Sequence, residues 1–200
     1  CPMADMADVP DIERMLGLLA RRFPGRRLVP VTYVNSTAEV KALTGRLGGI
    51  VCTSANAERA LKWAFERGDL VLFMPDRMLG LNTALALGEK CCLMADPFTG
   101  GFEEVYAPGC PPIVECEPRV VVWNGYCHVH TLFTADHVAA ARRAHPNARI
   151  LVHPECSPSV VSASDGAGST NYLVDQVENG KPGSVFVIGT EINRVRRIGS

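Results

Sequence analysis

The chain has 200 residues, a formal net charge of -1 and a sequence pI near 6.6. A chain of this length can bury a sizeable core, which predicts one large globular domain or two small ones. This charge does not indicate the excess of basic residues that nucleic-acid-binding proteins use to contact phosphates. No apolar stretch approaches the length of a membrane span and no signal segment is recognisable, so we expect a cytoplasmic protein without nucleic-acid or membrane partners.

Eight cysteines indicate either a disulfide framework or thiolates used for metal or redox chemistry. Without a signal segment, a reducing compartment and thiolate chemistry are expected. The chain starts at Cys1 rather than at a methionine, so we expect it to be an incomplete part of a longer protein.

Hydrophobic periodicity predicts that helices and strands alternate along the first half of the chain. Residues 36–39 have the pattern of a capping box that opens one of these helices. Such alternation is typical of α/β proteins with parallel sheets. The predicted elements are a helix over 11–22, a strand over 28–34, a helix from 36, a strand over 49–52, a helix over 57–65, a strand over 70–73 and a helix over 77–87.

The same order of elements recurs in the second half of the chain. The two halves can be aligned from Cys1 and from Cys127. Each then has a helix, a proline, an arginine and a strand in the same order, and the strand ends at Tyr33 in the first half and at His153 in the second. This pattern indicates an internal duplication, with domains at 1–126 and 127–200. The predicted elements here are a helix over 134–144, a strand over 149–152, a helix over 158–164 and a strand over 185–188.

Residues 88–119 interrupt the repeat with Gly-Gly, Pro-Gly and Pro-Pro pairs, which predict a long excursion or lid. Polar residues follow the predicted strands in both halves. Because ligands of open α/β sheets bind at the carboxyl ends of the strands, these residues are candidates for a binding site.

Seven short motifs resemble those of the quinolinate synthase family, in the family's order and at roughly its spacing. The resemblance covers nearly the whole chain. The motifs are YVNSTAEVKA at 33–42, CTSANA at 52–57, PDRMLG at 75–80, WNGYCHVH at 123–130, HPEC at 153–156, GST at 168–170 and GTE at 189–191.

The resemblance implies a fold of three similar three-layer α/β/α domains around a pseudo-threefold axis, of which this chain holds about two. It also implies condensation of iminoaspartate with dihydroxyacetone phosphate to quinolinate, in the biosynthesis of NAD. An L-aspartate oxidase that supplies iminoaspartate is then a candidate partner. On this basis the chain lacks an N-terminal part and a C-terminal part, and it is expected to be nearly inactive alone.

The resemblance further implies a [4Fe-4S] cluster held by one cysteine from each domain, and Cys1 and Cys127 match two of these positions. Three thiolates leave one iron open to act as a Lewis acid on the substrate. The third cysteine is expected beyond Ser200.

The family match also suggests roles for residues at the strand ends. His130, Glu155 and Tyr33 are the candidate catalytic groups, with Glu155 a candidate general base. Each has an ordinary structural alternative, such as a buried histidine or a surface turn. Ser54 and Thr170 are also expected to cap helices. The expected substrate-binding residues are Tyr33, Asn35, Ser54, His153, Glu155 and Thr170.

Two other functions compete with this hypothesis. One is a non-catalytic α/β module that binds a small anion at its strand ends. The other is a zinc or redox-thiol protein, although the cysteines of the excursion match no strong zinc pattern. Cys52 and Cys156 are expected to be small buried apolar residues. The excursion cysteines left unassigned are Cys91, Cys92, Cys110 and Cys116.

Overall fold

The computed structural model describes residues 1–89, 91–106 and 117–198. The chain divides into two compact units, Cys1–Tyr126 and Cys127–Ser200, and each is described by itself. Among the described residues, no helix is both long and apolar enough to cross a lipid bilayer.

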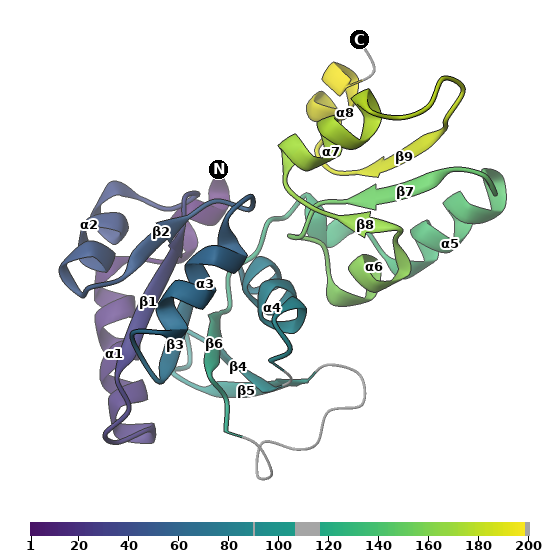
Figure 1. The fold of residues 1–200 in the computed structure, drawn as a ribbon. Helices are drawn as coiled ribbons and strands as arrows, with labels where there is room; N and C mark the ends of the chain where they lie inside the picture. The colour runs from purple at the N-terminus through teal and green to yellow at the C-terminus, as the bar shows by residue number, and fades with distance from the viewer. Residues whose placement is uncertain (90, 107–116, 199–200) are drawn as a thin grey trace. The chain divides into compact units, whose positions relative to one another are not determined.

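A six-stranded sheet forms the centre of the first unit, in the order β2-β1-β3-β6-β4-β5. All of its strands are parallel except β5, which pairs antiparallel with β4 at one edge. Helices cover both faces, so the unit has three layers (Figure 1). The strands are β1 (Leu28–Tyr33), β2 (Ile50–Cys52), β3 (Leu70–Met74), β4 (Cys91–Ala95), β5 (Phe102–Tyr106) and β6 (Val120–Trp123).

The helices of the first unit alternate with its strands along the chain. α1 and α2 bury apolar residues against one face of the sheet, whereas α3 and α4 pack together on the other face. A short 3-10 helix, η1 (Pro2–Met6), precedes them. The α-helices are α1 (Val9–Arg22), α2 (Ala38–Arg46), α3 (Ala57–Phe65) and α4 (Arg77–Ala86).

Helix α1 shows how the sequence specifies these elements. Asp8 caps its first turn by accepting a hydrogen bond from the backbone N–H of Asp11 at 2.8 Å. Ile12, Met15 and Leu19 recur at helical spacing and are fully buried. The helix ends at Arg22, and Gly25 then takes a positive φ of 80° that other residues adopt at a cost.

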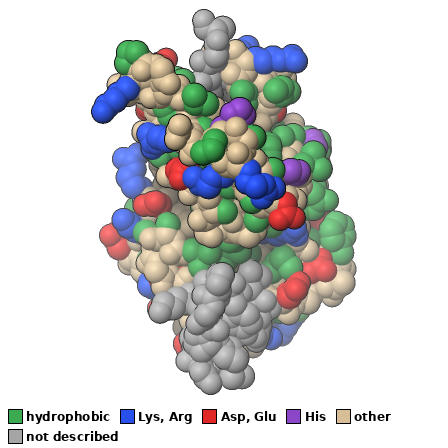
Figure 2. Space-filling model, turned by 90° about the vertical axis from the view of Figure 1, so that its right-hand side faces the viewer, with side chains coloured by type: hydrophobic (Ala, Val, Ile, Leu, Met, Phe, Trp, Pro, Cys, Tyr) green, Lys and Arg blue, Asp and Glu red, His purple; other side chains and the backbone are tan. Residues whose placement is uncertain are grey.

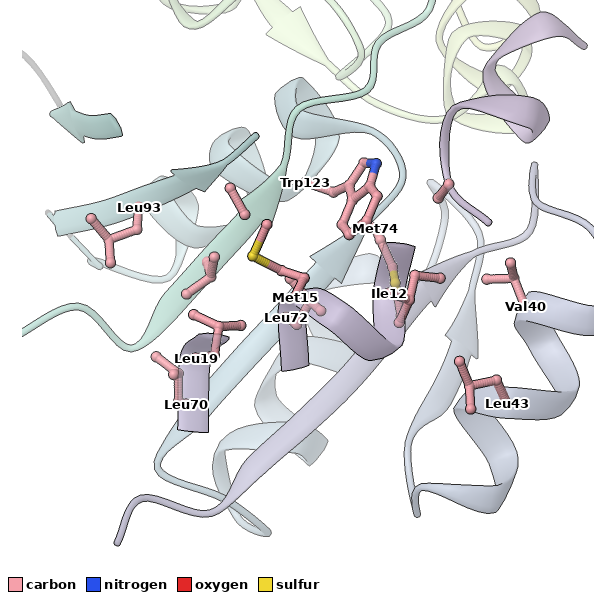
Figure 3. Close-up of a cluster of buried hydrophobic side chains, with 13 residues drawn as sticks. Ile12, Met15, Leu19, Val40, Leu43, Leu70, Leu72, Met74, Leu93 and Trp123 are labelled. Atoms are coloured by element: carbon pink, nitrogen blue, oxygen red, sulfur yellow. The ribbon is translucent and has the colours of Figure 1, made fainter. Parts of the chain in front are cut away.

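The core of the first unit lies between α1, α2 and the sheet (Figure 3). Trp123 of β6 is among its largest side chains and is fully buried. Its indole Nε1–H donates to the carbonyl oxygen of Met6 at 2.7 Å, which satisfies its buried polar group. The same contact anchors η1 beside the end of β6.

The second unit has a smaller parallel sheet in the order β8-β7-β9. α5 and α6 pack on one face, and α7 and α8 lie on the other (Figure 1). The strands are β7 (Arg149–Val152), β8 (Gly166–Ala167) and β9 (Phe186–Gly189), and the helices are η3 (His130–Leu132), α5 (Ala135–Ala144), α6 (Pro158–Ala163), α7 (Thr170–Glu178) and α8 (Ile192–Ile198).

The predicted α/β class with parallel sheets is confirmed, whereas several local predictions are wrong or incomplete. Part of the predicted excursion forms β4 and β5, which extend the main sheet. The strand β6 was not predicted either. The cap of α2 is Thr37, whose side chain accepts from the N–H of Val40, while Ser36 Oγ donates to the carbonyl of Tyr33.

Ser54 and Thr170 are not the helix caps that we expected. Ser54 lies in a turn, and Asn56 is the N-cap of α3. Thr170 is the first residue of α7, which Ser169 caps by accepting from the N–H of Tyr172. In both cases the predicted position is one or two residues away from the cap, because neighbouring polar residues compete for it.

On the face drawn in Figure 2, basic and acidic side chains are mixed with hydrophobic ones rather than gathered into patches of one sign. This agrees with the formal net charge of -1.

Candidate active site

In the first unit, polar residues follow the carboxyl ends of the parallel strands. Tyr33 ends β1 and is only 5% exposed. Asn35 and Ser54 lie just past β1 and β2 and are half-buried. Asp76 follows β3, is fully buried, and caps α4 by accepting from the N–H of Leu79 at 2.7 Å. Because these strands are parallel, all four residues lie at the same edge of the sheet.

The first cluster candidate, Cys1, is exposed and is the N-cap of η1. Met6, at the end of η1, accepts from Trp123 through its carbonyl and from the backbone N–H of Tyr126 through its sulfur at 3.4 Å. The short helix that carries Cys1 is therefore fixed near the carboxyl end of β6.

In the second unit, four predicted residues converge in one buried cluster. His153 and Glu155 follow β7. Cys127 precedes η3, and His130 is the first residue of η3. These four residues are 3–8% exposed. One donor atom each from Cys127, His130 and Glu155 all lie within 4.8 Å of one another.

Glu155 lies between the two histidines of this cluster. Its Oε2 is 2.8 Å from Nδ1 of His130 and 3.9 Å from Nδ1 of His153. The shorter contact is not a hydrogen bond of normal geometry, because Nδ1 of His130 is buried without a well-aligned partner among the described residues. The backbone N–H of Glu155 donates to Nδ1 of His153 at 3.4 Å, so the ring proton of His153 is placed on Nε2.

The pKa values of the two histidines shift in opposite directions. Burial alone lowers the pKa of His130, but contacts with the Cys127 thiol and the Glu155 carboxylate, together with their charge, raise it to about 9. Burial lowers the pKa of His153 to about 4; the Glu155 charge opposes this and the His130 charge adds to it. One imidazole is thus charged and the other neutral at pH 7.

Thr190 belongs to the same cluster, although it was not predicted as a site residue. It follows β9, is 6% exposed, and its Oγ1 lies 3.1 Å from Nε2 of His130. The signal was present in the sequence, because Thr190 lies in the GTE motif at 189–191. Thr170, which was predicted, is half-buried at the start of α7.

The cysteines differ in their suitability as metal ligands. Burial raises the pKa of the Cys52 thiol to about 12, so this thiol stays protonated and packs as an apolar group. Cys156 is fully buried, and its Sγ donates to the carbonyl of Gly189 at 3.9 Å. Cys92 is buried within β4, and Cys110 and Cys116 lie outside the described residues.

Cys1 and Cys127 both offer the thiol group that iron–sulfur clusters use as a ligand. Both carry thiols rather than disulfides, and Cys1 is exposed whereas Cys127 is buried. In addition, Cys127 has a histidine and a carboxylate beside its sulfur.

A cavity of about 610 Å³ borders the buried group of polar side chains at Thr190. It extends between α5, α8 and the sheet of the second unit. Its walls are mainly aliphatic, with Val138, Ile150 and Val187 among them. Such a lining does not suit an anionic substrate, which needs N–H donors or cations. The polar cluster is therefore the candidate site, rather than this cavity.

The fold and the site together define an α/β protein with a buried Cys, His and Glu cluster at the carboxyl ends of parallel strands. A family model described as quinolinate synthetase A protein matches residues 1–200. The chain belongs to this family.

Curated relatives agree with this membership. The chain is 44% identical over 201 residues to quinolinate synthase from Bacillus velezensis (strain FZB42), covering 99% of this chain and 52% of that protein. It is 45% identical over 200 residues to quinolinate synthase from Bacillus cereus (strain ATCC 14579), and 44% to that from Geobacillus kaustophilus (strain HTA426), with the same coverage. The chain thus spans about half the length of the curated relatives it matches.

Proposed function

We propose that this chain forms part of a cytoplasmic quinolinate synthase, which condenses iminoaspartate with dihydroxyacetone phosphate and dehydrates the product to quinolinate. One observation carries the proposal: Cys127, His130, His153 and Glu155 converge in a buried cluster at the strand ends of the second unit. Membership of the quinolinate synthetase A family supports it.

Cys1 and Cys127 would hold a [4Fe-4S] cluster together with a further cysteine. When bound, a cluster with three thiolate ligands supplies one open iron that acts as a Lewis acid on a substrate oxygen. The buried cysteines Cys52 and Cys156 are not ligands in this proposal.

Glu155 and the two histidines would handle substrate protons. Glu155 is buried between them and is positioned as a general base. His130 has a pKa of about 9 and so carries a proton that it can donate to a substrate oxygen leaving as water. His153 is neutral and offers its Nε2–H to a substrate carboxylate.

The first unit would supply further substrate contacts. Tyr33, Asn35 and Ser54 lie at the strand ends where a carboxylate or phosphate can meet hydroxyl and amide donors. Thr170 at the start of α7 is the corresponding group in the second unit. We also infer that an L-aspartate oxidase supplies the iminoaspartate.

A chimera tests the proposal. Residues 1–200 replace the matching half of the Bacillus cereus relative, and the product is reconstituted with iron and sulfide under anaerobic conditions. We expect quinolinate formation from iminoaspartate and dihydroxyacetone phosphate. Glu155→Gln should lower kcat by about 100-fold, the usual contribution of a general base, while Glu58→Gln, an exposed carboxylate in α3, serves as the matched control.

The iron content separates the competing functions. Cys127→Ala should abolish the brown cluster, whereas Cys52→Ala should retain it. A folded chimera that takes up no iron and forms no quinolinate would instead favour the module that binds a small anion without catalysis.

A further inference from the structure

The side chains of Cys127, His130 and Glu155 meet closely enough to coordinate one ion. Their donor atoms lie within 4.8 Å of one another, and all three residues are less than 10% exposed. From this we propose that they form a site for a single divalent cation of the Zn²⁺ class. The site lies wholly within the second unit, so it depends on no contact with the first.

An unsatisfied nitrogen points to a ligand at this place. Nδ1 of His130 is buried and has no well-aligned hydrogen bond among the described residues, although Oε2 of Glu155 is 2.8 Å away. A buried polar atom without a partner costs about 1–3 kcal/mol in general, so such atoms normally have one. A cation bound by this nitrogen, with the Glu155 carboxylate as a second ligand, gives the nitrogen its partner.

The other nitrogen of the same ring has the partner that metal-binding histidines have. Nε2 of His130 lies 3.1 Å from the Thr190 hydroxyl, which is itself buried. When Nε2–H donates to this hydroxyl and the cation displaces the proton on Nδ1, the lone pair of Nδ1 faces the thiol and the carboxylate. A hydrogen bond on the second ring nitrogen sets the tautomer and orientation of metal-ligating histidines in the same way.

The donor set selects the class of cation. A thiolate, an imidazole and a carboxylate together suit Zn²⁺, Co²⁺ or Fe²⁺, whereas Mg²⁺ and Ca²⁺ prefer oxygen ligands alone. In a tetrahedral zinc site, the donors are about 3.3–3.8 Å apart, given bonds of about 2.0 Å to nitrogen and oxygen and about 2.3 Å to sulfur. The donor atoms, which lie within 4.8 Å of one another, must move into this range when an ion binds. Three protein ligands leave the fourth position open.

The site has a regulatory consequence, which rests on the proposed function. The thiolate of Cys127 would be a ligand of the cation and also of the iron–sulfur cluster. A bound Zn²⁺ therefore withholds a cluster ligand, and it also occupies the carboxylate of the candidate base. Divalent zinc-class ions are expected to compete with cluster loading.

Cobalt titration of the metal-free 200-residue chain tests the site without requiring the cluster or catalysis. A Cys1→Ser background removes the N-terminal cysteine, which can chelate metals by itself. We expect one tightly bound Co²⁺ per chain, with tetrahedral ligand-field bands and a thiolate-to-cobalt charge-transfer band, and displacement by Zn²⁺. Because this readout is independent of activity, its failure leaves the proposed synthase function standing.

Variants identify the ligands. Cys127→Ser should remove the charge-transfer band, and His130→Gln and Glu155→Gln should each weaken binding by about tenfold or more. Thr190→Val should weaken binding while Thr190→Ser retains it, which separates a positioning role from general structure. His145→Gln, an exposed histidine after α5, is the control.

Circular dichroism checks that each variant folds, and X-ray absorption of the zinc-loaded parent gives a second measurement that needs no variant. One sulfur ligand with nitrogen and oxygen donors supports the proposal. Two or more sulfur ligands, or a charge-transfer band that survives Cys127→Ser, would overturn it, because the cation would then bind to other cysteines.

Discussion

His130 and His153 stack with ring centroids 4.7 Å apart and planes inclined by 21°, yet their pKa values shift in opposite directions. Both rings are buried beside the carboxylate of Glu155. The difference arises because Glu155 and the Cys127 thiol contact His130 closely, whereas Nδ1 of His153 already accepts a backbone N–H. The pair therefore holds one proton donor and one neutral ring in the same small volume.

The two histidines are expected to titrate far apart in the metal-free chain. His130 should lose its proton near pH 9 and His153 should gain one only near pH 4, so that at pH 7 the first is charged and the second neutral. NMR of side-chain nitrogens in ¹⁵N-histidine-labelled protein measures both values. Titration of both rings near 6.5 would contradict this prediction.

Replacement of the Glu155 carboxylate should shift the pKa values of both histidines in the same direction. The charge of Glu155 raises the pKa of His130 and of His153. In Glu155→Gln both pKa values should therefore fall, each by about 1 pH unit or more for a close charge. Glu178→Gln, an exposed residue at the end of α7, is the matched control and should leave both titrations unchanged.

A methyl group at Gly80 should destabilise the first unit. A Cβ added there would lie 2.7 Å from Cδ1 of Phe73 and 2.9 Å from Cγ1 of Val122, because α4 approaches the sheet closely. Gly80→Ala should lower the free energy of unfolding by about 1–3 kcal/mol, the usual cost of overpacking.

Fluorescence-monitored urea unfolding reports on this change, since both tryptophans, Trp63 and Trp123, lie in the first unit. Gly17→Ala in α1 is the control: its nearest contact would be a flexible arginine atom at 3.8 Å. Alanine there should stabilise the helix by up to about 1 kcal/mol. Equal destabilisation by both substitutions would contradict the prediction that close packing at Gly80 causes the loss of stability.

Asp165 should make the second unit sensitive to acid. A hydrogen bond from the N–H of Ile150, at 2.7 Å, and the Arg142 guanidinium lower the pKa of this carboxyl below its ordinary value of 3.8. A lowered pKa stabilises the folded state above the ordinary value, and this contribution is lost as pH falls through the folded pKa.

Asp165→Asn should therefore cost about 1 kcal/mol at pH 7, since the group is partly exposed and its ion pair is screened by solvent. The difference from the parent should shrink at low pH. Hydrogen exchange of the Ile150 amide measures the local effect, and Asp175→Asn in α7 is the control. A difference that stays constant down to pH 2 would contradict the linkage.

Local patterns in the sequence determined many of the helices and strands of this protein. Strands β1, β2, β3, β7 and β9 and helices α1 to α6 were predicted within one or two residues, because their apolar periodicity and flanking turns are short-range signals. Helices α7 and α8 and the short strand β8 were not predicted. Strands β4 and β5 were missed, because they lie among Gly and Pro signals and are stabilised by pairing with residues distant in sequence. β6 was also missed, although its run of three valines and a tryptophan carried a strand signal.

The sequence also determined the family, through its seven motifs, and pointed to Cys127, His130, His153 and Glu155. Only the tertiary structure decided that these four side chains lie in one buried cluster with Thr190, from segments up to 63 residues apart in number. The opposite pKa shifts of the two histidines and the unsatisfied Nδ1 were equally beyond the sequence. They depend on burial and on distances of a few ångströms, which arise only when the strand ends of β7 and β9 are brought together by the sheet.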